Sequence, residues 1–100
     1  MPLRTVDLTA RLTDEANNPL EDKTINFYYR VSGQTQWTSI GSRTTDSNGY
    51  ATISVDVTVP GTYDFRAHFP GDDQYDESYA EVLNMVIKAK TLLTLTVQAR

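Results

Sequence analysis

Apolar residues recur at every second position along most of the chain, and this alternation restricts the fold more than any other feature. In the first segment Val6, Leu8, Ala10 and Leu12 alternate with polar residues. A period of two places apolar side chains on one face of a β-strand, whereas a helix needs a period of 3.6. The alternation therefore predicts strands with one buried face and no helix. The residues expected to face the core are Val6, Leu8, Ala10, Leu12, Ile25, Phe27, Tyr29, Val31, Ala51, Ile53, Val55, Val57, Tyr63, Phe65, Ala67 and Phe69.

Turn-forming residues separate these segments. Residues 14–19, 32–34, 46–49, 60–61 and 70–78 are rich in Gly, Pro, Asn, Asp and Ser. We expect Asn48-Gly49 to close a hairpin, because both residue types tolerate the positive φ of tight turns. A weaker strand holds Trp37 and Ile40 and bends near Gly41. Short strands at this spacing predict an all-β fold, a two-sheet antiparallel β-sandwich of about seven strands.

The last strand of the sandwich, over residues 80–89, has apolar residues on both faces. Val82 and Val86 fall on one parity, and Leu83, Met85 and Ile87 fall on the other. We expect the Leu83 face to be the buried one, with a β-bulge as the feature that would change the register.

Composition narrows the function classes. The chain has 100 residues, a net charge of −4 and no cysteine. Scattered basic residues argue against nucleic-acid binding, which uses a clustered basic face. Disulfides and cysteine-based zinc sites are excluded, and no apolar run approaches the roughly 18 residues of a membrane span. Residues 1–4 lack the apolar stretch of a signal peptide. We expect the chain to be an internal piece of a longer protein, with a methionine added at the start of the piece.

Four motifs in a fixed order carry a family resemblance. They are residues 8–14 (LTARLTD), residues 19–27 (PLEDKTINF), residues 45–52 (TDSNGYAT) and residues 61–75, which begin with GTYDFRAHFPGD. Over residues 6–90 the set resembles the bacterial immunoglobulin-like (Big) repeats of prokaryotic cell-surface proteins and adhesins. The resemblance implies an immunoglobulin-like sandwich, an extracellular or cell-surface location within a larger protein, and neighbouring repeat domains as partners.

The C-terminal segment stands apart from the rest. Residues 91–100 (TLLTLTVQAR) resemble the strand that opens a Big repeat, and no equivalent strand precedes Arg4. We therefore divide the chain into a sandwich over residues 1–90 and an extra strand over residues 91–100. That strand either completes a sheet, in this domain or in a neighbour, or begins a next repeat. A free strand of this kind also predicts weak self-association.

An acidic loop is the sharpest candidate for a ligand site. Carboxylates bind calcium well, and the loop offers four, with Asp14 and Glu15 joining them if the two loops meet. The alternative is a solvated loop whose carboxylates hold turns, and we expect no other metal or cofactor. The four loop residues are Asp72, Asp73, Asp76 and Glu77.

The remaining candidates are aromatic residues and one histidine. His68 is the only histidine and falls on an outward face, so we expect a surface role rather than catalysis or metal binding. An exposed aromatic platform for carbohydrate is the other candidate, with Tyr28 and Tyr50 on one sheet and Trp37 or Tyr79 nearby. We predict a non-enzymatic spacer or presenting module of a tandem-repeat surface protein. The alternative is a carbohydrate- or protein-binding accessory module.

Overall fold

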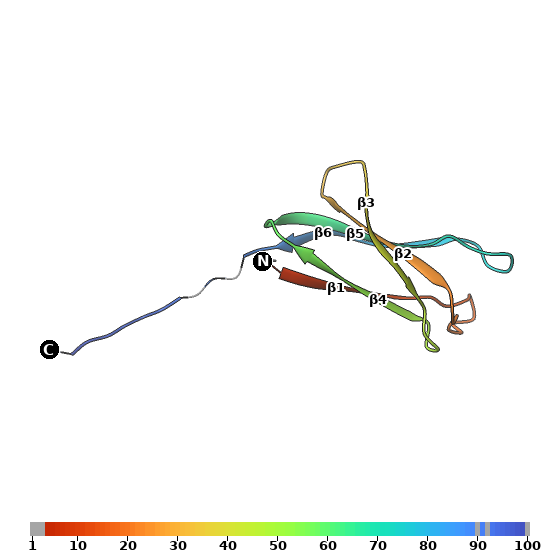
Figure 1. Ribbon diagram of the computed structural model, residues 1–100, viewed down its shortest axis with the longest axis horizontal. Coiled ribbons are helices and arrows are strands. Elements are labelled where there is room, and N and C mark those ends of the chain that lie inside the picture. Colours follow the sequence, from red (N-terminus) through yellow and green to blue (C-terminus); the bar gives the residue numbers. More distant parts are fainter. Residues whose placement is uncertain (1–3, 90, 92, 100) are drawn as a thin grey trace.

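The computed structural model describes residues 4–89, 91 and 93–99, and its strands form two layers (Figure 1). A two-stranded sheet pairs β1 (Arg4–Arg11) with β4 (Tyr50–Val57). A four-stranded sheet has the order β3-β2-β5-β6, from β2 (Thr24–Val31), β3 (Thr38–Thr44), β5 (Gly61–Phe69) and β6 (Ser78–Ile87). All pairings are antiparallel. The predicted all-β sandwich is confirmed, with six strands in the described part of the chain where about seven were expected.

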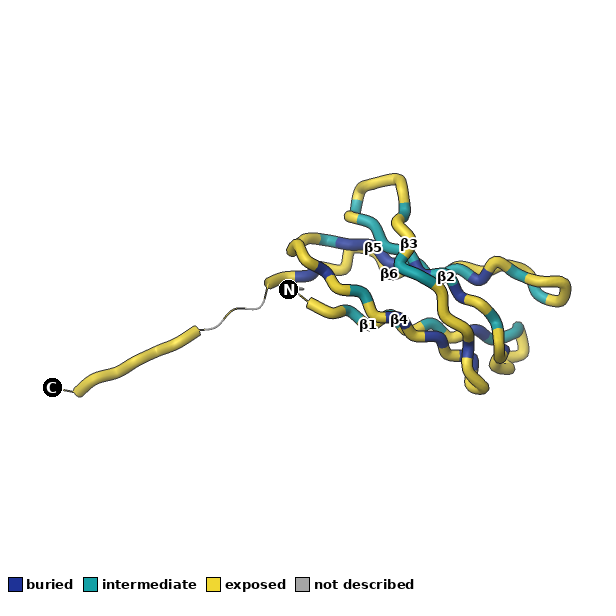
Figure 2. The backbone as a smooth tube through the Cα atoms, in the orientation of Figure 1, coloured by how far each residue is buried: buried dark blue, intermediate teal, exposed yellow. Residues whose placement is uncertain are grey.

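The alternating apolar residues lie between the two sheets, as expected. Phe27 is the most deeply buried large side chain, and Ile25, Ile53 and Phe69 pack around it. A second cluster forms around Phe65, from the other half of β5. Val31, at the end of β2, departs from the prediction because 45% of its surface is exposed. Figure 2 shows how buried and exposed positions alternate along β4.

The predicted register of β6 was wrong for Leu83. That residue is 52% exposed, because the pairing of β5 with β6 shifts between Tyr63 and Phe65. Val82 therefore pairs with Phe65 before the shift, and Met85 pairs with Tyr63 after it. Asn84 has a φ of 61° at this bulge. A bulge of this kind moves the following side chains to the other face.

The turn over residues 46–49 forms, but it does not close a hairpin within one sheet. It joins β3, in the four-stranded sheet, to β4, in the two-stranded sheet. Gly49 has a φ of 83°, and its N–H donates to the Asp46 carbonyl at 2.9 Å. The turn therefore carries the chain from one layer to the other.

The first and last described parts of the sandwich lie side by side. The Arg4 Nε donates to the Lys88 carbonyl oxygen at 3.3 Å. Beyond this point residues 93–99 extend away from the sandwich (Figure 1), while Met1–Leu3, Lys90, Leu92 and Arg100 lie outside the described residues. In the described ranges, no helix has the length and apolar character needed to cross a membrane.

Candidate functional site

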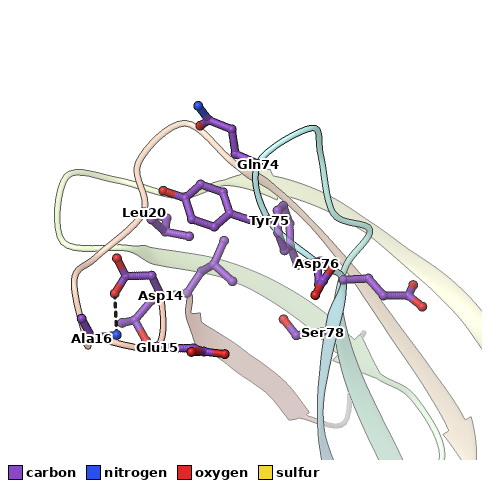
Figure 3. A pocket seen from close by; sticks show the side chains of 12 residues that line it. Asp14, Glu15, Ala16, Leu20, Gln74, Tyr75, Asp76 and Ser78 are labelled. Carbon is purple, nitrogen blue, oxygen red and sulfur yellow. Dashed lines mark hydrogen bonds between the residues drawn. The ribbon is translucent and has the colours of Figure 1, made fainter.

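Two loops meet at one end of the sandwich and line a pocket of about 590 Å³ (Figure 3). One loop follows β1 and contributes Asp14 and Glu15, and the other joins β5 to β6 and contributes Asp76 and Glu77. The sequence-based condition for a shared acidic site, that these loops come together, is therefore met. The roles of the individual carboxylates decide what the pocket can do.

Asp72 holds its own loop in shape. One carboxylate oxygen accepts the backbone N–H groups of Gln74 and Tyr75, each at 2.9 Å. The other accepts the Lys23 Nζ at 2.6 Å. The Lys23 ammonium, followed by the backbone N–H groups, lowers the pKa of Asp72, and the Asp72 carboxylate raises the pKa of Lys23. Both oxygens are thus engaged in contacts that position the loop.

The other acidic residues of the loop do not converge with Asp72 on one site. Asp73 and Asp76 are exposed, and the Glu77 carboxylate lies 3.0 Å from Nε2 of His68. Across the described part of the chain, no three histidine or acidic side chains form a group that could hold a metal ion. The contacts of Asp72 favour the turn-holding alternative, and calcium binding by Asp72, Asp73, Asp76 and Glu77 is left for experiment to decide.

Asp14 and Asp46 hold two further turns in the same way as Asp72. One carboxylate oxygen of Asp14 accepts the backbone N–H groups of Ala16 and Asn18, each at 2.9 Å. The backbone N–H of Asn18 is the largest cause of a lowered pKa at Asp14. Asp46 accepts the N–H groups of Asn48 and Tyr50 at 2.8 and 3.0 Å. These aspartates satisfy loop N–H groups that no strand pairs.

The outer face of the four-stranded sheet carries a row of stacked cationic and aromatic side chains. The Trp37 ring contacts two guanidinium groups, that of Arg30 at 4.1 Å from the ring centroid and that of Arg66 at 4.3 Å. Arg66 also lies 5.1 Å from the Tyr79 ring, which stacks on His68 at 4.2 Å. We call this row the aromatic ladder. His68 lies on this outer face, as its parity predicted, but its stacking on Tyr79 leaves only 18% of its side chain exposed.

The expected aromatic platform is only partly assembled. Tyr28 lies opposite Arg66 in the four-stranded sheet, but Tyr50 is on β4 in the other sheet, where its ring lies 5.5 Å from the guanidinium of Arg11. The prediction that Tyr28 and Tyr50 share a sheet was wrong, because the chain changes layers at the turn before β4. Trp37 and Tyr79, the weaker candidates, are the residues that the structure brings together through Arg66.

Asp64 is a buried charged residue that sequence reasoning missed. It is 3% exposed, on β5 opposite the bulge in β6. Its carboxylate accepts Ser32 Oγ at 2.6 Å, Arg30 Nε at 2.8 Å and the backbone N–H of Asn84 at 2.9 Å. These bonds, led by that of Ser32, lower its pKa to about 2. Its outward parity indicated exposure, and only the bulge, which brings Asn84 to it, reverses that indication.

These features agree with a comparison to known families. A family model described as bacterial Ig-like domain (group 1) matches residues 4–82. The chain belongs to this family. No curated protein and no solved structure matches it. Bacterial Ig-like domains are structural domains, typically without enzymatic activity, and commonly occur in surface or extracellular proteins. The sequence resemblance to Big repeats is thereby confirmed.

Proposed function

We propose that this bacterial Ig-like domain is a non-enzymatic spacer that helps to project other domains from a cell-surface protein built of tandem repeats. The family match supports the structural role. Such a role requires a domain that stays folded between its neighbours, so side chains should be used chiefly to hold the fold.

The observation that supports the proposal most is that four aspartates accept hydrogen bonds that hold the fold. Asp14, Asp46, Asp64 and Asp72 each accept two or more hydrogen bonds from loop N–H groups or neighbouring side chains. A general acid or base needs a perturbed pKa near the working pH and access to a substrate proton. The pKa values of Asp14, Asp64 and Asp72 are instead lowered below those of ordinary carboxyl groups, which moves them further from neutral pH. These carboxylates therefore remain charged acceptors that stabilise two turns, for Asp14 and Asp72, and the pairing of β5 with β6, for Asp64.

The spacer role makes a prediction about the complete protein. Its sequence should contain further copies of the Thr-Asp-x-Asn-Gly and Gly-Thr-Tyr motifs beside this domain. Antibodies raised against the domain should label intact cells, and protease added outside should remove that labelling. A single copy fused to a catalytic domain, or labelling only after the cells are broken open, would contradict the proposal.

The aromatic ladder supports a second candidate function, binding of carbohydrate or a protein. Tyr79 is 55% exposed, and aromatic rings beside arginine are enriched at binding surfaces. A glycan array and a screen of purified surface proteins would test this candidate. Binding that is lost in Trp37→Ala and Tyr79→Ala, and kept in Tyr50→Ala on the opposite sheet, would establish it. The absence of binding, or equal losses in all three variants, would refute it.

A further inference from the structure

An apolar groove runs between β1 and β6. Its walls come from residues 7–11 of β1 and residues 80–82 of β6, and Phe27, Phe65 and Ala67 line it between them. Its volume is about 380 Å³. In the described part of the chain, β1 pairs only with β4. The edge of β1 that faces the groove therefore keeps backbone N–H and C=O groups available for another strand.

The inward side of β6 is uncovered where it borders the groove. Val82 and Met85 pair with the buried residues Phe65 and Tyr63, so they point to the interior side of the sheet. Nevertheless 58% of Val82 and 45% of Met85 is exposed. Ile87, on the same side, is only 5% exposed. The two-stranded sheet is thus too narrow to cover the four-stranded one, and the space is next to β1.

The C-terminal segment has the pattern of a strand that would fit this space. In residues 93–99, Leu93, Leu95 and Val97 alternate with Thr94 and Thr96. These three residues are 93%, 85% and 82% exposed. Figure 2 colours the end of the chain beyond the grey trace as exposed. Seven residues in a strand span about 23 Å, close to the roughly 26 Å of the eight-residue β1. We call residues 93–99 the tail segment.

We propose that the tail segment of one copy of this domain fills the β1–β6 groove of another copy, pairing antiparallel with β1. Leu93, Leu95 and Val97 would then enter the groove, and Thr94 and Thr96 would face outward beside Thr5, Asp7 and Thr9. The inference identifies the surface through which one domain would contact the next. It rests on the proposed spacer function only in assuming that such domains lie next to one another on a cell-surface protein.

The direction of the chain favours a second copy over the chain's own tail. β6 ends beside the beginning of β1, as the Arg4–Lys88 hydrogen bond shows. The chain's own tail would have to reverse within residues 88–92 (KAKTL), which contain none of the Gly, Asn or Asp residues that tight turns favour. It would also run parallel to β1. A tail from another copy enters at the Arg11 end instead and runs antiparallel.

This arrangement gives a head-to-tail array. Each copy releases its tail segment at the Arg4 end of its sandwich and receives one at the Arg11 end. The two contact surfaces differ, so the association is open rather than closed into a symmetric dimer. Charge favours it too, because the net charge of −4 divides into +3 for residues 88–100, from Lys88, Lys90 and Arg100, and −7 for the remainder.

Sedimentation of the full chain over a wide concentration range tests the proposal. We expect a series of species larger than the monomer, growing with concentration. Leu95→Lys should weaken the association at least about tenfold, which corresponds to ~1.4 kcal/mol, while Thr96→Lys should leave it unchanged. In the groove, Val82→Lys should weaken the association, and the matched variant Val59→Lys, in the turn before β5, should not. Val59 is 61% exposed, close to Val82.

Cysteine pairs test the direction, because the chain has no cysteine of its own. A Thr9→Cys copy mixed with a Thr94→Cys copy should form an intermolecular disulfide on mild oxidation, since antiparallel entry from the Arg11 end brings these positions together. A chain carrying both Thr5→Cys and Thr94→Cys would instead form an intramolecular disulfide if its own tail folded back.

Each contrary result overturns the proposal. A monomer at every concentration, an association that Leu95→Lys and Val82→Lys leave intact, or the intramolecular Thr5–Thr94 crosslink would each exclude strand donation between copies. None of these results bears on whether the complete protein carries further repeats on the cell surface, so failure here is distinguishable from failure of the spacer role.

Discussion

The buried hydroxyl of Thr45 gives the sharpest test of how the sandwich is held together. Thr45 is 2% exposed and lies just after β3. Its Oγ1 donates to the Leu20 carbonyl oxygen at 2.7 Å and accepts the backbone N–H of Lys23 at 2.9 Å. One side chain thus connects the segment before β2 to the end of β3. Thr45→Val keeps the shape and removes both bonds.

The expected cost follows from the surroundings of the two partners. The bond to Leu20 is buried, and a buried carbonyl left without its donor costs about 1–3 kcal/mol. The bond from Lys23 is part-buried and contributes about 0.5–1.5 kcal/mol. Together they predict a loss of about 3 kcal/mol in the free energy of unfolding, or a fall in Tm of about 12–24 °C for a domain of this size.

Thr45→Ser is the matched variant, because it keeps the hydroxyl and loses one methyl group. That loss should cost about 1 kcal/mol. Thermal unfolding followed by circular dichroism would give the Tm of both variants. A urea titration would give their free energies of unfolding, provided that the slope of free energy against urea concentration is the same in both. The reasoning would be refuted if Thr45→Val were as stable as Thr45→Ser or more stable, since the methyl group and not the hydroxyl would then dominate.

Three further predictions use single residues. Gly49→Ala should lower the Tm by at least about 5 °C more than Gly33→Ala. Both glycines have positive φ, but only at position 49 of these two would an added Cβ lie 2.5 Å from a backbone oxygen, that of Leu12. Equal losses in the two variants would contradict this prediction. Asp64 has a folded-state pKa of about 2 against an ordinary 3.8, so its contribution to stability is present above about pH 4 and is lost as the pH falls through 2. The Tm of Asp64→Asn should therefore vary less than that of the unchanged protein between these pH values. An equal pH dependence in both would contradict this role of Asp64. Millimolar calcium should leave the Tm unchanged relative to sodium chloride of equal ionic strength, because Asp72 is already bound to Lys23; a rise in Tm that Asp73→Asn abolishes would instead establish the calcium site.

The period of two was sufficient to predict most of the core. Strands β1, β2, β4 and β5 contribute residues whose inward parity could be counted from their own sequences, as for Phe27, Ile53 and Phe65. The hydroxyl of Tyr63, near the start of β5, donates to the Val59 carbonyl at 2.6 Å, a contact that tyrosines at such corners of sandwich folds often make. These features depend on local sequence and on which face is buried.

What depends on the pairing of distant strands could not be predicted. The side of β6 that faces the core depends on a bulge whose position is set jointly by Asp64 and Asn84, 20 residues apart. Likewise nothing near Tyr28 or Tyr50 indicates that their strands belong to different sheets. The residues of the aromatic ladder come from four segments of the chain, and only the strand order β3-β2-β5-β6 brings them together.

The family motifs are held together by direct contacts at one end of the sandwich. The N–H of Leu12 donates to the Gly49 carbonyl, the N–H of Leu20 donates to the Leu12 carbonyl, and Thr45 donates to Leu20. These four residues belong to three of the four motifs. Their order and spacing are therefore set by the lengths of the strands between them, which explains why the set identifies the family better than any motif alone.

The fourth motif joins the same end through the ion pair between Lys23 and Asp72. All four motifs thus specify how the loops at this end assemble, and a protein can satisfy them with any residues on its exposed faces. The surfaces on which we propose binding and strand donation lie elsewhere, on the outer face of β5 and in the β1–β6 groove. Substitutions there, such as Tyr79→Ala or Val82→Lys, should change association without changing the contacts that make the chain a bacterial Ig-like domain.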